Sequence, residues 1–147
     1  MASRIAEKPE ISPEEYGEFL QGIELRRIYL VDTRVKRKRS PSLEAVLRFN
    51  QDVVKSKFSK IEDGFTATFS FQVQLLEDDN EAPFADLMVS YVAEYSSEQK
   101  MTKKIFEIFG QYNLPLNLYP YVREYIHTTT NRMGLPSLVL PVLKASE

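Results

Sequence analysis

Cysteine is absent from this chain of 147 residues, and histidine occurs once, as His127. Without cysteine there are no disulfides, thiolate metal sites or cysteine nucleophiles. A single imidazole leaves no histidine pair for a metal ion, and we expect His127 to lie on the polar side of a helix. The sequence therefore predicts no metal site and no cofactor.

Long apolar runs and catalytic motifs are missing as well. No apolar stretch is long enough to cross a bilayer, and the N-terminal residues MASRIAEKPE lack the apolar core of a signal peptide. There is no GxxxxGK[ST] loop for phosphate and no G-x-S-x-G elbow for a nucleophile. The spacing of the acidic residues singles out no acid/base pair. We therefore expect a cytoplasmic protein that is not an enzyme.

Charge is unevenly distributed along the chain. The net charge is −2, yet residues 26–60 hold eleven Lys or Arg against three Asp or Glu, including the run VKRKRS at 35–40. Such a run is typical of a solvated turn that keeps a strand edge from pairing with other chains. The alternative is a surface for nucleic acid or an acidic partner, although no aromatic platform for base stacking is evident beside it.

The chain is long enough for one compact domain, 1–147, in which we expect residues 1–11 to be flexible. Ser12-Pro13-Glu14-Glu15 is a capping box with proline at the first helical position, so a short helix is predicted at 12–22. Its apolar stripe would fill a groove of its own chain or extend one.

Four strands follow. Odd positions from Ile23 to Val35 are mainly apolar, and Leu47, Phe49 and Val53 alternate with polar residues. Asp63-Gly64 indicates a hairpin turn before the alternating stretch 65–75, and a fourth alternation runs over 87–95. The short turns predict that the last three strands form an antiparallel meander.

Two helices complete the pattern. A helix beginning at Ser96 and ending at Gly110 presents Met101, Ile105, Ile108 and Phe109 on one side, and a longer helix has Pro120 in its first turn. The apolar side of the longer helix consists of Leu118, Val122, Tyr125, Ile126, Thr129 and Met133. The predicted fold is α+β: a four-stranded antiparallel sheet followed by two helices, with an extra short N-terminal helix.

Three segments carry a family resemblance. LYPYVRE at 118–124 resembles the L-F-P-Y-A-R-E motif of the bacterial export chaperone SecB, GLPSLVLPV at 134–142 resembles the family's G…P-x-L-x-L…P-V/I tail, and RIYLVD at 27–32 resembles its R-I-Y-x-x-D. The segments occur in the family's order and span residues 27–142. The chain therefore resembles the SecB-like chaperones.

That resemblance implies an ATP-independent holdase that binds unfolded polypeptides in apolar grooves and assembles as a homotetramer, a dimer of dimers. The client-binding residues it implies are Leu47, Phe49, Val53, Leu138 and Leu140, and ordinary core residues are the alternative for these positions. The implied oligomer interface comprises Leu118, Tyr119, Tyr121, Val122, Tyr125 and Ile126.

One departure from the family concerns partner docking. Members that deliver clients to the export motor SecA carry two acidic residues on the first strand; Asp32 matches one, but Lys36 stands at the other. A positive charge there would be repelled by a motor surface adapted to acids, so we expect no docking on SecA. We also expect no membrane partner, because no apolar stretch is long enough to cross a bilayer. Three functions remain open: a general holdase, a dedicated chaperone of an antitoxin in a toxin–antitoxin–chaperone system, and a nucleic-acid-associated protein.

Overall fold

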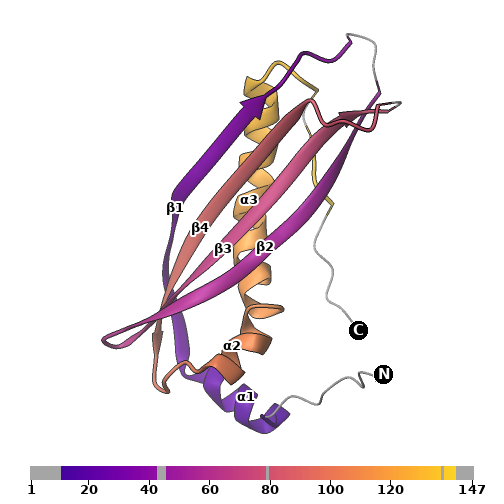
Figure 1. Cartoon of the computed structure of the whole chain (residues 1–147). Coiled ribbons are helices and arrows are strands. Elements are labelled where there is room, and N and C mark those ends of the chain that lie inside the picture. Colours follow the sequence, from indigo (N-terminus) through magenta and orange to yellow (C-terminus); the bar gives the residue numbers. More distant parts are fainter. Residues whose placement is uncertain (1–10, 43–45, 79, 137, 142–147) are drawn as a thin grey trace, which may run out of the picture.

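The computed structural model describes residues 11–42, 46–78, 80–136 and 138–141. The elements follow in the order α1 (Pro13–Gln21), β1 (Ile23–Arg37), β2 (Leu47–Ile61), β3 (Gly64–Glu77), β4 (Ala85–Ser97), α2 (Lys103–Phe109) and α3 (Asn113–Arg132). All strand pairs are antiparallel, and the sheet order is β1-β4-β3-β2 (Figure 1). The α+β class and the meander of β2, β3 and β4 are confirmed. The predicted flexible segment 1–11 lies outside the described residues except for Ile11.

The first helix begins at the predicted capping box. The Ser12 hydroxyl accepts from the Glu15 amide at 3.1 Å, and the Glu15 carboxylate accepts from the Ser12 amide at 2.9 Å. Phe19 enters the core, where its ring lies 6.1 Å from that of Phe65 and 6.4 Å from that of Phe109. The apolar stripe of α1 thus fills the end of its own core, one of the two roles expected for it.

Strands β3 and β4 hold the centre of the sheet, and their alternation is as predicted. The odd-numbered side chains from Phe65 to Leu75 are buried, and those from Leu87 to Tyr95 are buried opposite them. Gly64 is required where β3 begins, because a Cβ there would lie 1.9 Å from the carbonyl oxygen of Tyr95. We call the face with these buried residues the inner face and the opposite one the outer face.

Strand β1 departs from the predicted alternation. Its register against β4 shifts between Leu25 and Arg27 and again between Leu30 and Asp32. Each shift turns the following side chains to the other face of the sheet. Ile28 and Leu30 therefore pair with inner-face residues of β4, and Tyr29 faces outward, so the expectation that Tyr29 shares a face with Ile23 and Val35 is wrong.

Helix α2 begins later than predicted, and helix α3 begins earlier. Strand β4 continues through Ser97, and α2 begins only at Lys103, capped by the Thr102 hydroxyl, which accepts from the Ile105 amide at 3.2 Å. Helix α3 begins at Asn113, so Pro115 occupies its first turn and Pro120 lies in its interior. The missing amide of Pro120 is tolerated because the proline is exposed, where water can satisfy the carbonyl left free one turn earlier.

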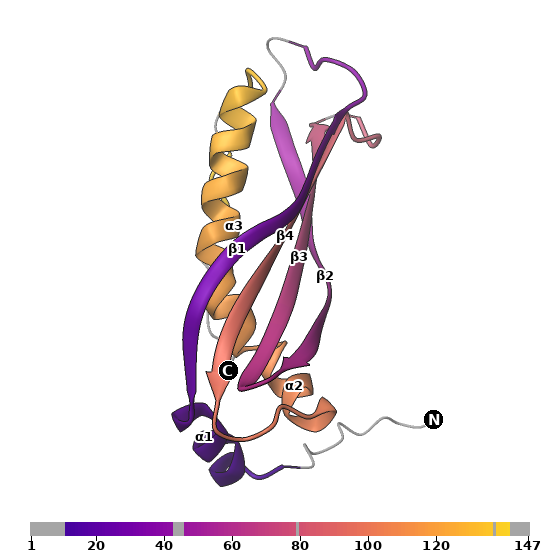
Figure 2. The same ribbon diagram turned by 90° about the vertical axis from the view of Figure 1, so that its left-hand side faces the viewer.

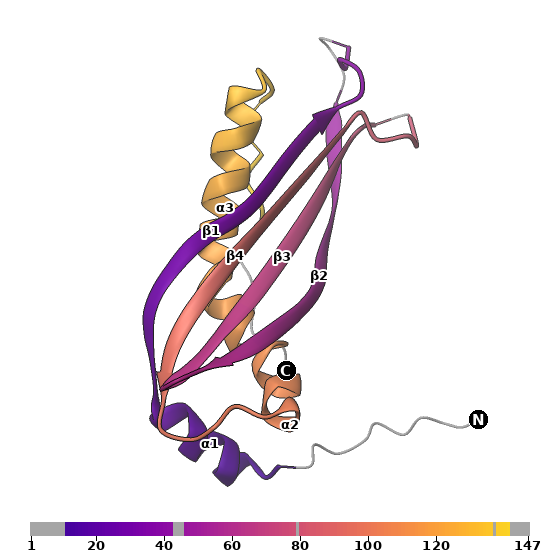
Figure 3. The same cartoon turned by 60° about the vertical axis from the view of Figure 1, so that its left-hand side comes forward.

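Helix α3 covers the inner face of the sheet along its length, and α1 and α2 lie together at one end (Figures 2 and 3). With 20 residues, α3 is about 30 Å long. Its core-facing side chains repeat every four residues, at Leu114, Leu118, Val122, Ile126 and Thr130. No helix in the described part of the chain is long and apolar enough to cross a membrane.

Candidate functional site

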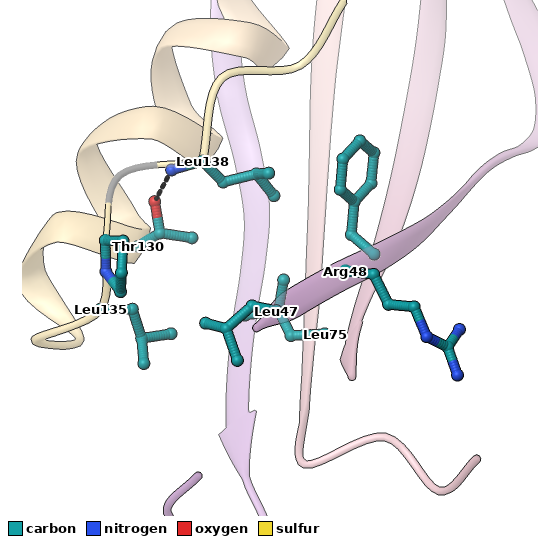
Figure 4. Close-up of a pocket in the computed structure, with 8 residues that line it drawn as sticks. Leu47, Arg48, Leu75, Thr130, Leu135 and Leu138 are labelled. Carbon is teal, nitrogen blue, oxygen red and sulfur yellow. Dashed lines mark hydrogen bonds between the residues drawn. The ribbon is translucent and has the colours of Figure 1, made fainter. Parts of the chain in front are cut away.

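Two apolar hollows lie next to each other along the inner face of β2. The first, which we call the Phe49 hollow, has a volume of about 220 Å³ (Figure 4). It is lined by Leu47, Arg48, Phe49, Leu75, Thr130, Leu135, Pro136 and Leu138. The second, the Val53 hollow, has a volume of about 280 Å³ and is lined by Gln51, Asp52, Val53, Phe69, Phe71, Pro115 and Tyr119. Both lie below the roughly 300 to 1,000 Å³ of a typical small-molecule site, and each suits one or two side chains.

The order of strands explains why the hollows form on β2. Helix α3 packs on β3 and β4, and β2 lies at the sheet edge, so its inner face is only partly covered. Leu47 and Phe49 are half-buried, and Val53 is 48% exposed. Apolar side chains that stay this accessible beside a packed core are typical of a binding surface.

The segment after α3 forms the far wall of the Phe49 hollow. Gly134 adopts φ of 76°, a left-handed conformation that suits glycine, and turns the chain back along the helix. The buried Thr130 hydroxyl accepts from the Leu138 amide at 3.0 Å and donates to the Ile126 carbonyl at 2.9 Å. Arg123 Nε then donates to the carbonyl oxygen of Leu140 at 3.0 Å. These bonds fasten Leu138 and Leu140 to α3.

The predicted client-binding residues are partly brought together. Leu47, Phe49 and Leu138 line one hollow, and Val53 lines the next. Leu140 is 1% exposed, because its side chain is already covered by its own chain, so as a client contact it is corrected to a core residue. Client contact by Leu47, Phe49, Val53 and Leu138 stays a prediction. Ser137 and Val142 of the tail motif lie outside the described residues.

The predicted oligomer interface is largely internal to the protomer. Leu118, Val122 and Ile126 are fully buried under the sheet, and Tyr119 is buried beside Phe71, with ring centroids 5.6 Å apart. For these four residues the interface assignment is corrected, since their apolar surface is used within the chain. Tyr125 is half-buried with its hydroxyl hydrogen-bonded to the Thr33 hydroxyl, and Tyr121 is 46% exposed. Tyr121 is thus the most accessible of the six.

The lining of the site is mainly apolar, with one charged side chain in each hollow, Arg48 in the first and Asp52 in the second. Tyr119 lines the Val53 hollow, and burial raises the pKa of its phenol, with Arg123 acting in the opposite direction. The group is therefore uncharged at neutral pH. Among the described residues, no three His, Asp or Glu side chains gather closely enough to hold a metal ion.

The basic region does not form one continuous face. Most of its residues lie on β1 and β2, which are opposite edges of the sheet, and Lys38 and Arg39 follow the end of β1. Several are paired: Arg26 with Asp63 at 2.5 Å, Arg27 with Glu94 at 3.1 Å, Lys38 with Asp86 at 3.2 Å and Arg39 with Glu77 at 3.1 Å. Asp32 and Lys36 both lie on the outer face, opposite Ser90 and Asp86 of β4. Their role in docking stays a prediction.

Thr130 is the residue of the site that the sequence interpretation missed. The apolar side of α3 had been assigned Thr129, but the four-residue repeat of 118, 122 and 126 continues to Thr130, which is 1% exposed. Leu75, Leu135 and Pro136 were also missed as lining residues. A stricter extension of the helical repeat would have found Thr130; the position of the tail depends on Gly134 and could not be read from spacing.

Comparison with known proteins supports the fold. The SecB-like chaperone Rv1957 of Mycobacterium tuberculosis, solved in complex with a ChAD peptide from the antitoxin Rv1956 HigA1, superposes with a TM-score of 0.79. The two chains share 21% identity over 90% of this chain and 99% of that one. The chain therefore has the SecB-like fold, as the three motifs predicted.

Other comparisons add little. A protein of unknown function from Streptococcus agalactiae superposes with a TM-score of 0.46 and 10% identity over 82% of this chain and 97% of that one, too weakly to bear on the fold. No family model matches the chain. No curated protein matches it either.

Proposed function

We propose that this protein is an ATP-independent holdase that binds non-native polypeptide segments in the two hollows beside β2. The observation that carries the proposal is their arrangement: two apolar hollows of side-chain size, side by side along one edge strand. Such a surface suits an extended chain with separate apolar anchors better than it suits a compact ligand. The same fold occurs in a SecB-like chaperone solved with a peptide bound.

A holdase of this kind acts by mass action. Binding the unfolded chain lowers the concentration of free unfolded protein, and with it the rate of aggregation. Weak contacts at successive hollows reinforce one another, because the second contact forms at a high effective concentration once the first is made. No nucleotide is needed for this action.

A dedicated antitoxin client is the second candidate. Rv1957, which shares the fold, was solved with a peptide of an antitoxin. A chaperone with one client does not need to dock on an export motor, which agrees with Lys36 standing where the export family has an acid. An antitoxin encoded beside this protein would then bind more tightly than unrelated unfolded chains.

We also propose self-association, as a tetramer, through the solvent side of α3. Tyr112 and Leu116 are each 49% exposed and lie one helical turn apart at the start of α3. Large apolar side chains aligned on an exposed helix face are typical of subunit contacts. Light scattering coupled to gel filtration should give a mass four times the 17.0 kDa of the chain.

The test of the holdase function is aggregation. A chemically unfolded protein is diluted into buffer without ATP, and light scattering is followed with and without this protein. Suppression at near-stoichiometric ratios is expected with several unrelated clients. Suppression of one antitoxin alone would favour the dedicated chaperone, and failure with the antitoxin and with all other clients would contradict client binding.

A further inference from the structure

Strand β2 leaves half of its backbone hydrogen-bonding groups open over residues 47–53. It pairs with β3 on one side, and no strand among the described residues pairs with its other side. The Asp78 amide donates to the Val46 carbonyl at 2.8 Å, so Val46 directs its backbone groups toward β3. Because these directions alternate in an antiparallel pair, residues 48, 50, 52 and 54 also face β3, whereas 47, 49, 51 and 53 face the open edge.

The residues with open backbone groups are also the residues that line the hollows. Leu47 and Phe49 line the Phe49 hollow, and Gln51 and Val53 line the Val53 hollow. An added strand would therefore find hydrogen-bond partners on the same residues that receive its side chains. If a client bound through side-chain contacts alone, the residues that line the hollows would not need to have open backbone groups.

The other exposed edges of the sheet are protected against pairing. Strand β1 is interrupted by two register shifts and carries exposed Arg27, Arg34 and Lys36. The second half of β2 has a register shift between Val54 and Lys57 and continues with lysines. These are the features by which proteins prevent edge pairing. Residues 47–53 have an unbroken register.

The local charge also selects the occupant. Residues 46–54 contain one Arg and one Asp, so this stretch is electrically neutral between two basic segments. A neutral apolar segment is matched to it, whereas a basic segment would be repelled from both sides. The fit is to an extended, uncharged polypeptide segment.

We propose that the client binds as an added β-strand on the open edge of β2, with apolar side chains four residues apart in the two hollows. This inference rests on the proposed holdase function. Phe49 lines one hollow and Val53 the other, and four residues of extended chain span about 13 Å, so anchors four residues apart fall on one face of the added strand, opposite these two residues. In an antiparallel addition the anchor residues also exchange hydrogen bonds with β2.

The test uses a synthetic nine-residue peptide of serine and threonine with phenylalanine at the third and seventh positions. One derivative carries N-methyl groups on alternate residues that include the two phenylalanines; the other carries them on the intervening residues. Edge pairing uses the amides of one set only, so one derivative should bind at least about tenfold more weakly and the other should keep its affinity. Equal binding of the two derivatives would overturn the added strand.

A matched pair of protein variants tests the same edge. Gln51→Pro removes one open amide without removing a β2–β3 hydrogen bond, whereas Gln51→Ala changes only the side chain. We expect Gln51→Pro to weaken binding of the unmethylated peptide clearly more than Gln51→Ala does, because only the proline removes the backbone donor; equal effects of the two variants would count against the added strand. If Gln51→Pro instead lowers the native mass, the edge is occupied by a second copy and the proposal fails. If the unmethylated peptide and unfolded proteins do not bind at all, the holdase function itself fails.

Discussion

The docking of α1 can be tested by replacing Phe19 with alanine. Phe19 is 1% exposed and packs against Phe65 of β3 and Phe109 of α2. Removing a buried phenylalanine typically costs about 3 to 5 kcal/mol of unfolding free energy, against a total of about 5 to 15 kcal/mol for a domain. Nine residues are too few for a stable isolated helix, so α1 depends on this anchor.

The assay is urea unfolding followed by circular dichroism, comparing Phe19→Ala with Glu18→Ala. Glu18 is exposed on the same helix, so its replacement should change stability by less than about 0.5 kcal/mol. We expect Phe19→Ala to lower the midpoint strongly. A loss below about 1 kcal/mol would refute the conclusion that α1 is part of the core, because no fully packed phenylalanine is removed so cheaply.

Three further predictions concern pH, the tail and assembly. Burial, with a further contribution from Tyr95, raises the pKa of Tyr16 from 10.0 to about 12, so this tyrosine stabilises the fold below pH 10 and the stabilisation is lost as pH rises toward 12. Tyr16→Phe should flatten the alkaline loss seen in urea unfolding, and an unchanged slope would contradict the assignment. Thr130→Val should cost about 1 to 2 kcal/mol and speed hydrogen exchange at the Leu138 amide, whereas unchanged exchange would mean that the bond does not hold the tail. Leu116→Glu should lower the native mass of the assembly, and a mass equal to that of the unmodified protein would remove α3 from the interface.

The central strands were predictable because one side of each is fully covered. Alternation over 65–75 and 87–95 specifies a single register, since a shift by one residue would expose every phenylalanine of β3. The start of α1 was also predictable, because the capping box depends only on the adjacent residues Ser12 to Glu15.

Strand β1 was harder, because apolar side chains occur at both odd and even positions. Ile28 and Leu30 reach the inner face only because of the two register shifts. In a strand with apolar residues on both faces, the sequence pattern does not reveal where such a shift occurs. The interface prediction was wrong for four of its six residues for a related reason: helical spacing identifies an apolar side of α3 but not whether the sheet or another subunit covers it.

The candidate site was predictable in part. Leu47, Phe49 and Val53 were identified from alternation and family resemblance, and the structure places them along the two hollows. Leu140 was wrongly predicted to contact the client, and Thr130 was not recognised as a lining residue. The positions of both relative to the site depend on how the chain folds back after Gly134.

The most direct measurement of the central claim is the affinity of a permanently unfolded chain, such as reduced and carboxymethylated lactalbumin, for Phe49→Ser and Asn50→Ser. Phe49 faces the hollow and its neighbour Asn50 faces outward, so the two variants differ in the face they alter. A client that buries roughly 60 Å² of the Phe49 ring gains about 1.5 kcal/mol, or about tenfold in affinity. We predict that loss for Phe49→Ser, with Asn50→Ser unchanged and the native mass preserved in both. Equal affinities for the two variants, or unfolding of Phe49→Ser, would contradict the account and assign Phe49 to the core.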